Sequence, residues 1–275
     1  MAITHRAAIV GKPIGHSLSP VLHNAGYAAL GMDDWEYGSF ECDAAGLADL
    51  VASLDDTYVG LSVTMPGKFA MLDIAEEISP RCEDIGSGNT LVRTPTGWRA
   101  DNTDVDGIRA ALERLRVDAP TVAAEGSEAV LIGGGGTART VLWTMAELGC
   151  SKVTVINRTD RSDELSPLVT RTGAEFEWLP PHADLEPVVE RASVVINTVP
   201  VDGTTDVVEA CSNAPLFDVI YNPWPTPLAK AVRAKGHPVA GGHVMLAHQA
   251  FSQFEQFTGL AAPEESMWAA LMDRF

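Results

Sequence analysis

A glycine-rich turn between an apolar run and a helical pattern is the first stretch of the chain whose residues could do chemistry. Residues 129–132 are apolar, glycines fill 133–136, and Gly133, Gly135 and Ala138 match the spacing G-x-G-x-x-G/A. In this pattern the first glycine permits a tight turn, the second lets the backbone approach a pyrophosphate, and the small third residue lets a helix pack on its strand. Free N–H groups at the helix start then face the anion. The predicted cofactor contacts here are Gly133, Gly134, Gly135, Gly136, Thr137 and Ala138.

The residues after the next apolar run indicate which dinucleotide binds. A strand predicted at 152–156 ends before Asn157, Arg158 and Thr159, where an NAD enzyme usually carries an acid for the ribose 2′-hydroxyl. An arginine instead suits a 2′-phosphate, and Arg161 is close enough in sequence to join it, because guanidinium groups match phosphate geometry. The sequence therefore predicts NADP, with Asn157, Arg158, Thr159 and Arg161 among its contacts.

A second group of polar residues precedes the glycine turn. Thr64 and Lys68 follow a predicted strand at 58–63, which is where α/β sheets place ligands, beyond the carboxyl ends of their strands. A hairpin predicted from 90–93 and 98–100 delivers Asp104 to a helix starting near Val105. An acid at that position would also be favourable as a helix cap. These residues are candidates for a substrate site.

The segments that must position these residues alternate along the chain between the hydrophobic pattern of a strand and that of a helix. This alternation predicts an α/β fold. We expect two domains: residues 1–104 with 243–275, which bind substrate and carry catalysis, and residues 105–242, a Rossmann-like doubly wound domain that binds NADP. The C-terminal helices have no strand to cross over to, so they should return to the first domain. Ser19 is expected to be the N-cap of the first helix. The expected strands are 6–10, 35–40, 58–63, 129–132, 152–156, 174–179, 192–196 and 216–220.

Composition excludes several classes of function. The 275 residues include 19 basic and 37 acidic side chains, a net charge of −18, which argues against nucleic acid or an anionic membrane as partner. No apolar run approaches the ~20 residues that span a bilayer, and the start of the chain lacks a signal-peptide pattern, so we expect a cytoplasmic protein. The four cysteines and seven histidines have no metal-binding spacing, and no metal is predicted.

Several short motifs occur in order along nearly the whole chain. They are Gly15-His16-Ser17-Leu18-Ser19-Pro20, Val63-Thr64-Met65-Pro66-Gly67-Lys68, Gly88-Asn89-Thr90, Asp101-Asn102-Thr103-Asp104, the glycine turn with Asn157-Arg158-Thr159, and Tyr221-Asn222-Pro223. Together they resemble the shikimate dehydrogenase family, NADP-dependent enzymes of aromatic amino-acid (chorismate) biosynthesis. The chain departs from the family at two places. The family often has asparagine where this chain has Ser62, and its usual Gly-Leu-Gly-Met is replaced by residues 242–245, Gly-His-Val-Met.

The resemblance implies an oxidoreductase that reversibly reduces 3-dehydroshikimate to shikimate with NADPH. It makes Lys68 and Asp104 the catalytic pair and places Val219 and Gly242 at the nicotinamide end of the cofactor. The substrate contacts that it implies are Ser17, Ser19, Thr64, Asn89, Tyr221 and Gln249.

The chemistry of hydride transfer accounts for this choice of pair. Oxidation of a secondary alcohol needs a proton removed from its hydroxyl, and a positioned acid–base group contributes roughly 10²–10⁴-fold. An ammonium with an ordinary pKa of about 10.4 is a poor base at neutral pH, so Lys68 must be desolvated or must depend on Asp104 for its orientation. Residue types alone leave open which of the two carries the proton.

The sequence leaves open the exact activity and the oligomeric state. An NAD-dependent quinate/shikimate dehydrogenase of the same fold is the alternative enzyme, and a catalytically inactive nucleotide-sensing binding protein is the alternative from another class. The expected partner is a small-molecule substrate, shikimate or 3-dehydroshikimate. A homodimer is compatible with the sequence and is not required by it.

Overall fold

The computed structural model describes residues 2–275, which form two compact units. The first runs to Asp106 and resumes at Leu246, and the second covers Gly107–Met245. The sequence predicts that the first domain ends at residue 104 and resumes at residue 243, whereas the first unit ends at 106 and resumes at 246. Helices α4 and α11 therefore each begin in one unit and end in the other.

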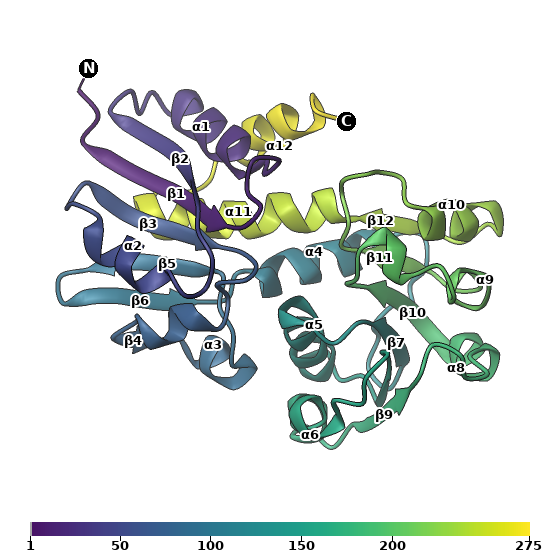
Figure 1. Ribbon diagram of the computed structural model, residues 1–275. Helices are drawn as coiled ribbons and strands as arrows, with labels where there is room; N and C mark the ends of the chain where they lie inside the picture. Colours follow the sequence, from purple (N-terminus) through teal and green to yellow (C-terminus); the bar gives the residue numbers. More distant parts are fainter. Residues whose placement is uncertain (1) are drawn as a thin grey trace. The chain divides into compact units, whose positions relative to one another are not determined.

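The first unit is built on a mixed six-stranded sheet with the order β2-β1-β3-β5-β6-β4 (Figure 1). Strands β2, β1 and β3 run parallel, β5 and β6 form an antiparallel hairpin beside β3, and β4 runs parallel to β6. The strands are β1 (His5–Gly11), β2 (Trp35–Glu41), β3 (Tyr58–Val63), β4 (Glu77–Ile78), β5 (Thr90–Thr94) and β6 (Gly97–Asp101). The helices are α1 (Ser19–Ala29), α2 (Leu47–Ser53), η1 (Ala70–Asp73), α3 (Pro80–Ile85), α12 (Glu264–Met272), the start of α4 (Asp104–Arg116) and most of α11 (Gly242–Thr258).

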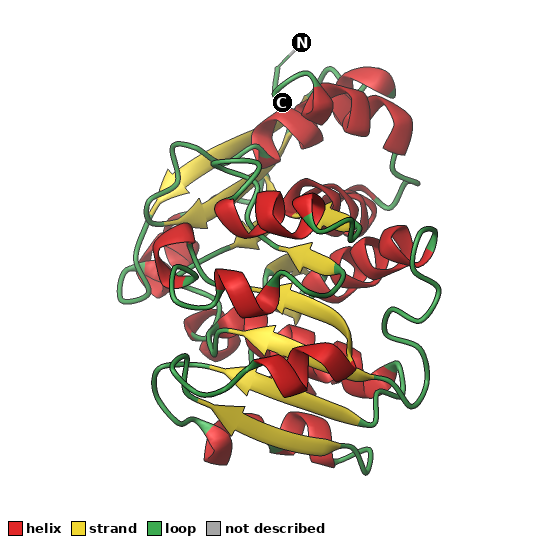
Figure 2. Ribbon diagram, turned by 90° about the vertical axis from the view of Figure 1, so that its right-hand side faces the viewer, coloured by secondary structure: helices red, strands yellow, loops and turns green. Residues whose placement is uncertain are grey.

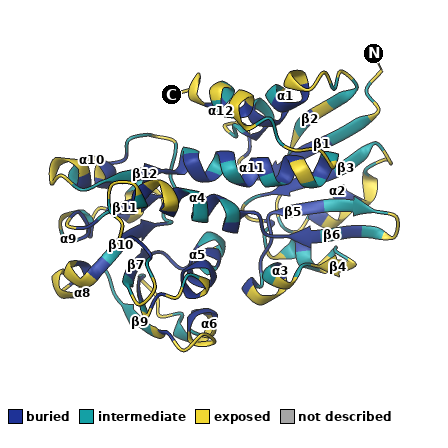
Figure 3. Cartoon of the chain, turned by 180° about the vertical axis from the view of Figure 1, so that it is seen from behind, coloured by how far each residue is buried: buried dark blue, intermediate teal, exposed yellow. Residues whose placement is uncertain are grey.

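Alternation along β1 buries both faces of this sheet. Ala7 and Ile9 join a core with residues of α1, α11 and α12, while Ala8 and Val10 join a core with residues of α2, η1 and α3. Both β1 and β3 are buried along most of their length (Figure 3). The apolar residues of β1 are continuous and do not alternate with polar ones. They are therefore buried only if helices cover both faces of the sheet.

The C-terminal helices pack on the first unit, as expected from the sequence. Helix α12 lies beside α1 (Figure 1). Phe257 of α11 covers Gly60 in β3. A Cβ atom at Gly60 would lie 2.1 Å from Cδ1 of Phe257. The missing side chain at Gly60 is therefore what lets α11 approach the sheet so closely.

The second unit is an all-parallel six-stranded sheet with the order β12-β11-β10-β7-β8-β9, and helices lie on both of its faces (Figure 2). This order is the doubly wound Rossmann arrangement, with the order reversing between β7 and β10. The strands are β7 (Glu128–Ile132), β8 (Lys152–Ile156), β9 (Glu175–Leu179), β10 (Ala192–Asn197), β11 (Leu216–Asp218) and β12 (Val239–Gly241). The helices are α5 (Gly136–Glu147), α6 (Ser162–Leu165), α7 (Pro167–Thr170), α8 (Glu186–Arg191), η2 (Val201–Gly203), α9 (Val208–Cys211) and α10 (Pro227–Ala234).

The α/β class and the Rossmann-like unit are confirmed, and the differences lie in details. Helix α1 begins at Ser19 itself with Leu18 at the cap position and no side-chain cap, so the assignment of Ser19 as N-cap is wrong. Strand β11 ends at Asp218 rather than 220, because the Asp218 carboxylate accepts the Ile220 N–H and turns the chain. The short strands β4 and β12 were not predicted, since two or three residues carry too little pattern. Across residues 2–275, no helix is both long and apolar enough to cross a bilayer.

The contact between Gly60 and Phe257 makes a testable prediction. Gly60→Ala should lower the free energy of unfolding by about 2 kcal/mol, because the new methyl group overpacks a buried contact. Gly38→Ala, in the edge strand β2, is the matched control, since a Cβ there meets nothing within 4 Å. Urea denaturation of the two variants measures the difference, and equal stabilities would contradict this account of how α11 docks.

Candidate active site

The topology of the first sheet brings distant polar residues to one edge. Because β1 and β3 are parallel and β5 is antiparallel to β3, the carboxyl end of β3 lies beside the amino end of β5. Ser62 pairs with Thr90, and Thr90 pairs with Asp101 of β6. The turn after β3, the loop before β5 and the segment after β6 therefore meet, and they carry Lys68, Asn89 and Asp104.

Lys68 and Asp104 form a direct ion pair at this edge. The Lys68 ammonium donates to Oδ2 of Asp104, and the two side chains are only 14% and 7% exposed. The backbone fixes the lysine as well, because the Gly88 N–H donates to the Lys68 carbonyl over 2.9 Å. Pairing stabilises two charges that are this well shielded from water, because an unpaired buried charge raises the free energy of the folded state.

Asn89 holds the other oxygen of the Asp104 carboxylate. Its Nδ2 donates to Oδ1 of Asp104 over 2.9 Å and also reaches Oε1 of Gln249 at 3.3 Å. Its Oδ1 accepts from the Thr103 backbone N–H at 2.8 Å and from the Thr90 hydroxyl at 2.7 Å. These acceptor contacts fix which way the amide faces, so the carboxylate of Asp104 is clamped between one cation and one amide.

The remaining predicted substrate residues of the first unit lie in the loops after β1 and β3. These loops are joined because the Thr64 N–H donates to Val10 and the Lys12 N–H to Met65, over 2.9 and 3.1 Å. Ser19 is buried, and its N–H lies 3.3 Å from the Ser17 hydroxyl. Ser17 and Thr64 are partly exposed at the same edge as Lys68. Their predicted contacts with substrate remain predictions.

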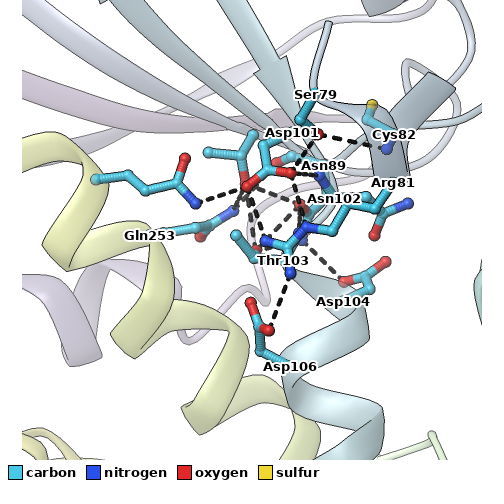
Figure 4. A network of polar contacts seen from close by, with 12 residues as sticks. Ser79, Arg81, Cys82, Asn89, Asp101, Asn102, Thr103, Asp104, Asp106 and Gln253 are labelled. Atoms are coloured by element: carbon cyan, nitrogen blue, oxygen red, sulfur yellow. Dashed lines mark hydrogen bonds and ion pairs between the residues drawn. The ribbon is translucent and has the colours of Figure 1, made fainter. Parts of the chain in front are cut away.

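An arginine that the sequence did not single out organises the segment leading to Asp104. Arg81 of α3 makes two hydrogen bonds to the Asp101 carboxylate, at 2.8 and 2.7 Å, and one to Asp106 at 3.0 Å (Figure 4). Ser79 and Gln256 also donate to Asp101, at 2.6 and 2.8 Å. Burial alone would raise the pKa of Asp101, but the hydrogen bonds from Arg81 and Ser79 and the charge of Arg81 outweigh it and hold the pKa well below its usual range.

This lowered pKa gives a pH-dependent prediction. A carboxyl whose folded pKa is depressed stabilises the fold above its unfolded pKa of about 3.9 and loses that contribution as the pH falls toward the folded value. Asp101→Asn should therefore lower the free energy of unfolding by about 3 kcal/mol at neutral pH, with the deficit shrinking below about pH 4.

Asp118→Asn serves as the control, because its pair with Arg114 is about 60% exposed on each side. The control should cost under about 1 kcal/mol at any pH. Denaturant titrations at several pH values measure both variants. A deficit for Asp101→Asn that stays constant from neutral pH to pH 2 would contradict the lowered pKa.

In the second unit, the glycine turn has the shape that its sequence predicted. Gly133 adopts a φ of +112°, and a Cβ there would lie 2.4 Å from Oγ1 of Thr198, so only glycine fits. Gly135 is the N-cap of α5, and a Cβ there would meet nothing within 4 Å. Ala138 is fully buried where α5 packs on β7. The turn thus leaves one side open toward the helix N-terminus, as phosphate binding requires.

A cavity of about 370 Å³ adjoins this turn at the point where the strand order reverses. Its walls come from the ends of β7 and β8 and from the loop after β10 that contains Val199 and Asp202, and Asn157 and Arg158 line it. Arg158 is exposed. Arg161 is engaged differently, because its guanidinium donates to the Glu164 carboxylate and to the Gly134 carbonyl. Of the two predicted arginines, Arg158 is therefore the one that faces the cavity.

The predicted nicotinamide contacts, Val219 and Gly242, lie where the backbone after β11 packs closely against the start of α11. A Cβ at Gly242 would be 2.0 Å from the Val219 carbonyl oxygen, so this glycine is required by the backbone of the turn after β11. Asp218 anchors the same turn, since it accepts from Thr226 at 2.6 Å and from Asn197 at 2.9 Å. Tyr221 follows in the same turn of the second unit. Its predicted role toward the substrate remains a prediction.

The part of the chain that the structure describes contains no group of three or more His, Cys, Asp or Glu side chains that could hold a metal ion. The polar side chains that meet at the sheet edge are a lysine, a carboxylate and an amide, Lys68, Asp104 and Asn89. A Rossmann unit with a glycine phosphate turn, in one chain with a buried lysine–aspartate pair, defines a dinucleotide-dependent oxidoreductase of the α/β class.

Comparison with known proteins identifies the family. Residues 9–91 match the model of the shikimate dehydrogenase substrate binding domain, and residues 242–272 match the shikimate 5′-dehydrogenase C-terminal domain. A shikimate dehydrogenase (NADP(+)) of Microcystis aeruginosa is 32% identical over 99% of this chain and 98% of its own length. The chain belongs to the shikimate dehydrogenase family.

Solved structures agree with this placement. The shikimate dehydrogenase of Mycobacterium tuberculosis is 44% identical, with a TM-score of 0.88 over 98% of this chain and 99% of that one. The shikimate 5-dehydrogenase of Thermus thermophilus, solved in complex with NADP(H) and shikimate, is 26% identical, with a TM-score of 0.81 over 98% and 100% of the two chains.

Proposed function

We propose that this chain catalyses the reversible, NADPH-dependent reduction of 3-dehydroshikimate to shikimate, with Lys68 and Asp104 as the acid–base pair. The observation that carries the proposal is the buried contact of Lys68 with an Asp104 carboxylate that Asn89 also holds. The named activity of the Microcystis relative and the ligands of the Thermus structure support the choice of substrate and cofactor.

The residues of the first unit supply the proton chemistry of the reaction. A bound nicotinamide exchanges a hydride with the substrate carbon, and this exchange requires a proton to move to or from the substrate oxygen. The Lys68 ammonium can donate a proton to the substrate oxygen when a ketone is reduced. The neutral amine can take that proton back when the alcohol is oxidised. Asp104 fixes the lysine and balances its charge. Asn89 prevents the carboxylate from turning away, because its amide faces only one way.

The other predicted residues have chemistry that suits a polyhydroxylated carboxylic acid. Ser17, Ser19 and Tyr221 offer hydroxyl donors for the carboxylate, and Thr64, Asn89 and Gln249 offer donors and acceptors for hydroxyl groups. Gln249 is already held close to Asn89, and its Nε2 donates to the Leu246 carbonyl over 2.9 Å. We assign these six residues to substrate binding.

The proposal also assigns NADP as the cofactor. The exposed Arg158 lines the cavity beside the glycine turn, and a guanidinium there suits a 2′-phosphate better than a ribose hydroxyl. The decisive experiment is a spectrophotometric assay of shikimate-dependent NADPH formation by the purified protein. Absence of turnover at saturating substrate and cofactor would reject the proposal and favour an inactive nucleotide-binding protein.

Removal of the lysine tests the catalytic role. Lys68→Ala should lower kcat by about 10³-fold, because the reaction loses its positioned acid–base group. The Kd for NADPH should stay close to the wild-type value. Lys230→Ala, an exposed lysine on α10, is the control and should keep full turnover. Steady-state kinetics and NADPH fluorescence titration give the two quantities, and a wild-type kcat in Lys68→Ala would exclude this role.

Cofactor preference tests Arg158 separately. Arg158→Ala should lower kcat/KM for NADP by about 30-fold and leave kcat/KM for NAD nearly unchanged, because a charge-assisted contact with the 2′-phosphate is lost. Arg114→Ala removes an exposed arginine from α4 and should alter neither value. A wild-type enzyme that prefers NAD and accepts quinate would instead support the alternative quinate/shikimate dehydrogenase.

A further inference from the structure

Gln253 of α11 lies outside the predicted site but is connected to it. The side chain is fully buried, and Figure 4 shows it within the polar network that contains Asn89 and Asp104. Its Oε1 accepts from the Ser62 hydroxyl at 2.6 Å, and its Nε2 donates to the Thr90 hydroxyl at 2.9 Å and to the Asn89 carbonyl at 3.1 Å. Both ends of the amide are therefore satisfied, and its orientation is determined by what it touches.

The hydroxyl groups on either side of Gln253 have a favoured direction of donation. The Tyr37 hydroxyl donates to Ser62 over 2.6 Å, so Ser62 uses its own proton toward Gln253. Thr90 accepts from Gln253, and its own proton has the shorter contact with Oδ1 of Asn89, at 2.7 Å against 3.2 Å to the Thr103 hydroxyl. Each hydroxyl has one proton to give, and these contacts use it.

The contacts form one continuous series that ends on the catalytic carboxylate. Five donations lead in order from Tyr37 to Ser62, Gln253, Thr90, Asn89 and finally Asp104. All six side chains are buried. Hydrogen bonds that all run in the same direction strengthen one another in a low-dielectric interior. The series therefore holds the Asn89 amide with its NH₂ group toward Asp104.

We infer that Gln253 and Ser62 are positioning residues for the Lys68–Asp104 pair, acting through Thr90 and Asn89. The inference rests on the proposed function, because it assumes that this pair performs the acid–base step. Ser62 is one of the positions where the chain departs from the family's usual asparagine. In this chain the Ser62 hydroxyl donates a hydrogen bond to the side-chain amide of Gln253 in α11.

The groups packed around Gln253 allow a clean test by pH. His23 of α1 stacks on Tyr37 with ring centroids 4.1 Å apart, and burial lowers the pKa of His23 to about 3, outweighing an interaction with Gln253 that raises it. Burial likewise raises the pKa of Tyr37, and Asp101 has the lowered pKa described above. With glutamine at position 253, none of these three groups changes charge between about pH 5 and pH 9.

Gln253→Glu is the informative variant because it has the same shape. An ionised carboxyl at this position can only accept, so it would take the Thr90 proton away from Asn89. A protonated carboxyl can donate to Thr90 and restore the original direction. Because burial raises the pKa of a carboxyl, this protonation should fall within the working range of the assay.

The expected result is a kcat about tenfold below wild type for Gln253→Glu at high pH, with the ratio to wild type rising as the pH falls. Gln253→Leu, which lacks both donor and acceptor, should show a loss that does not recover with pH. Ser62→Ala should lower kcat by about threefold, and the Kd for NADPH should be unchanged in all three variants. Ser39→Ala is the control, because Ser39 is exposed and pairs with the same residue of β1, Ile9, as Ser62 does.

Two outcomes would overturn the inference. One is a kcat within twofold of wild type in both Gln253→Glu and Ser62→Ala. The other is a loss in Gln253→Glu that is independent of pH and equal to that in Gln253→Leu, which would indicate a merely structural role. Ser62→Ala removes one oxygen atom and keeps the test available if the Gln253 variants fail to fold. Inactivity of the wild-type protein would instead reject the proposed function itself.

Discussion

The buried carboxylate of Asp104 is the constraint on which the first unit depends. One oxygen accepts from Lys68 and the other from Asn89, so the charge is paired and both oxygens are used. Such an arrangement is stable only if every partner is held in place, because loss of one leaves a buried charge unsatisfied. The antiparallel hairpin β5–β6 meets this need, since it returns the chain to the edge where β3 ends. Arg81 then fixes Asp101, three residues before Asp104.

The second unit solves a different electrostatic problem. The chain carries a net charge of −18, yet the predicted ligand is itself an anion. Binding must therefore come from local donors rather than from the field of the whole protein. The glycine turn provides them, because Gly133 takes a conformation that other residues avoid and Gly135 leaves the N-terminal end of α5 uncovered. Arg158 adds one charge at the neighbouring cavity, while Arg161 is retained by Glu164.

Membership of the shikimate dehydrogenase family and the detail of this chain answer separate questions. The family match covers the substrate-binding residues 9–91 and the C-terminal residues 242–272. Within that match, Ser62 and Gln253 make a connection that residue types alone do not reveal. A serine in β3 and a glutamine in α11 are 191 positions apart, yet they share one hydrogen bond of 2.6 Å. The close approach of α11 over Gly60 is what brings them together.

The sequence by itself determined the α/β class, the glycine phosphate turn and most of the longer strands, because these depend on local periodicity and on residues with special backbone freedom. It also singled out Lys68, Asn89 and Asp104 by their motifs, and the pairing of Lys68 with Asp104 came only from the family resemblance. Tertiary structure decided the rest. The strands β4 and β12 are too short to show a period, Arg81 has no local signal that would distinguish it from a surface arginine, and Gln253 resembles any polar residue of a helix. The physical reason is that a buried polar group is defined by its partners, and those partners come from distant elements that only the packed sheet and α11 bring together.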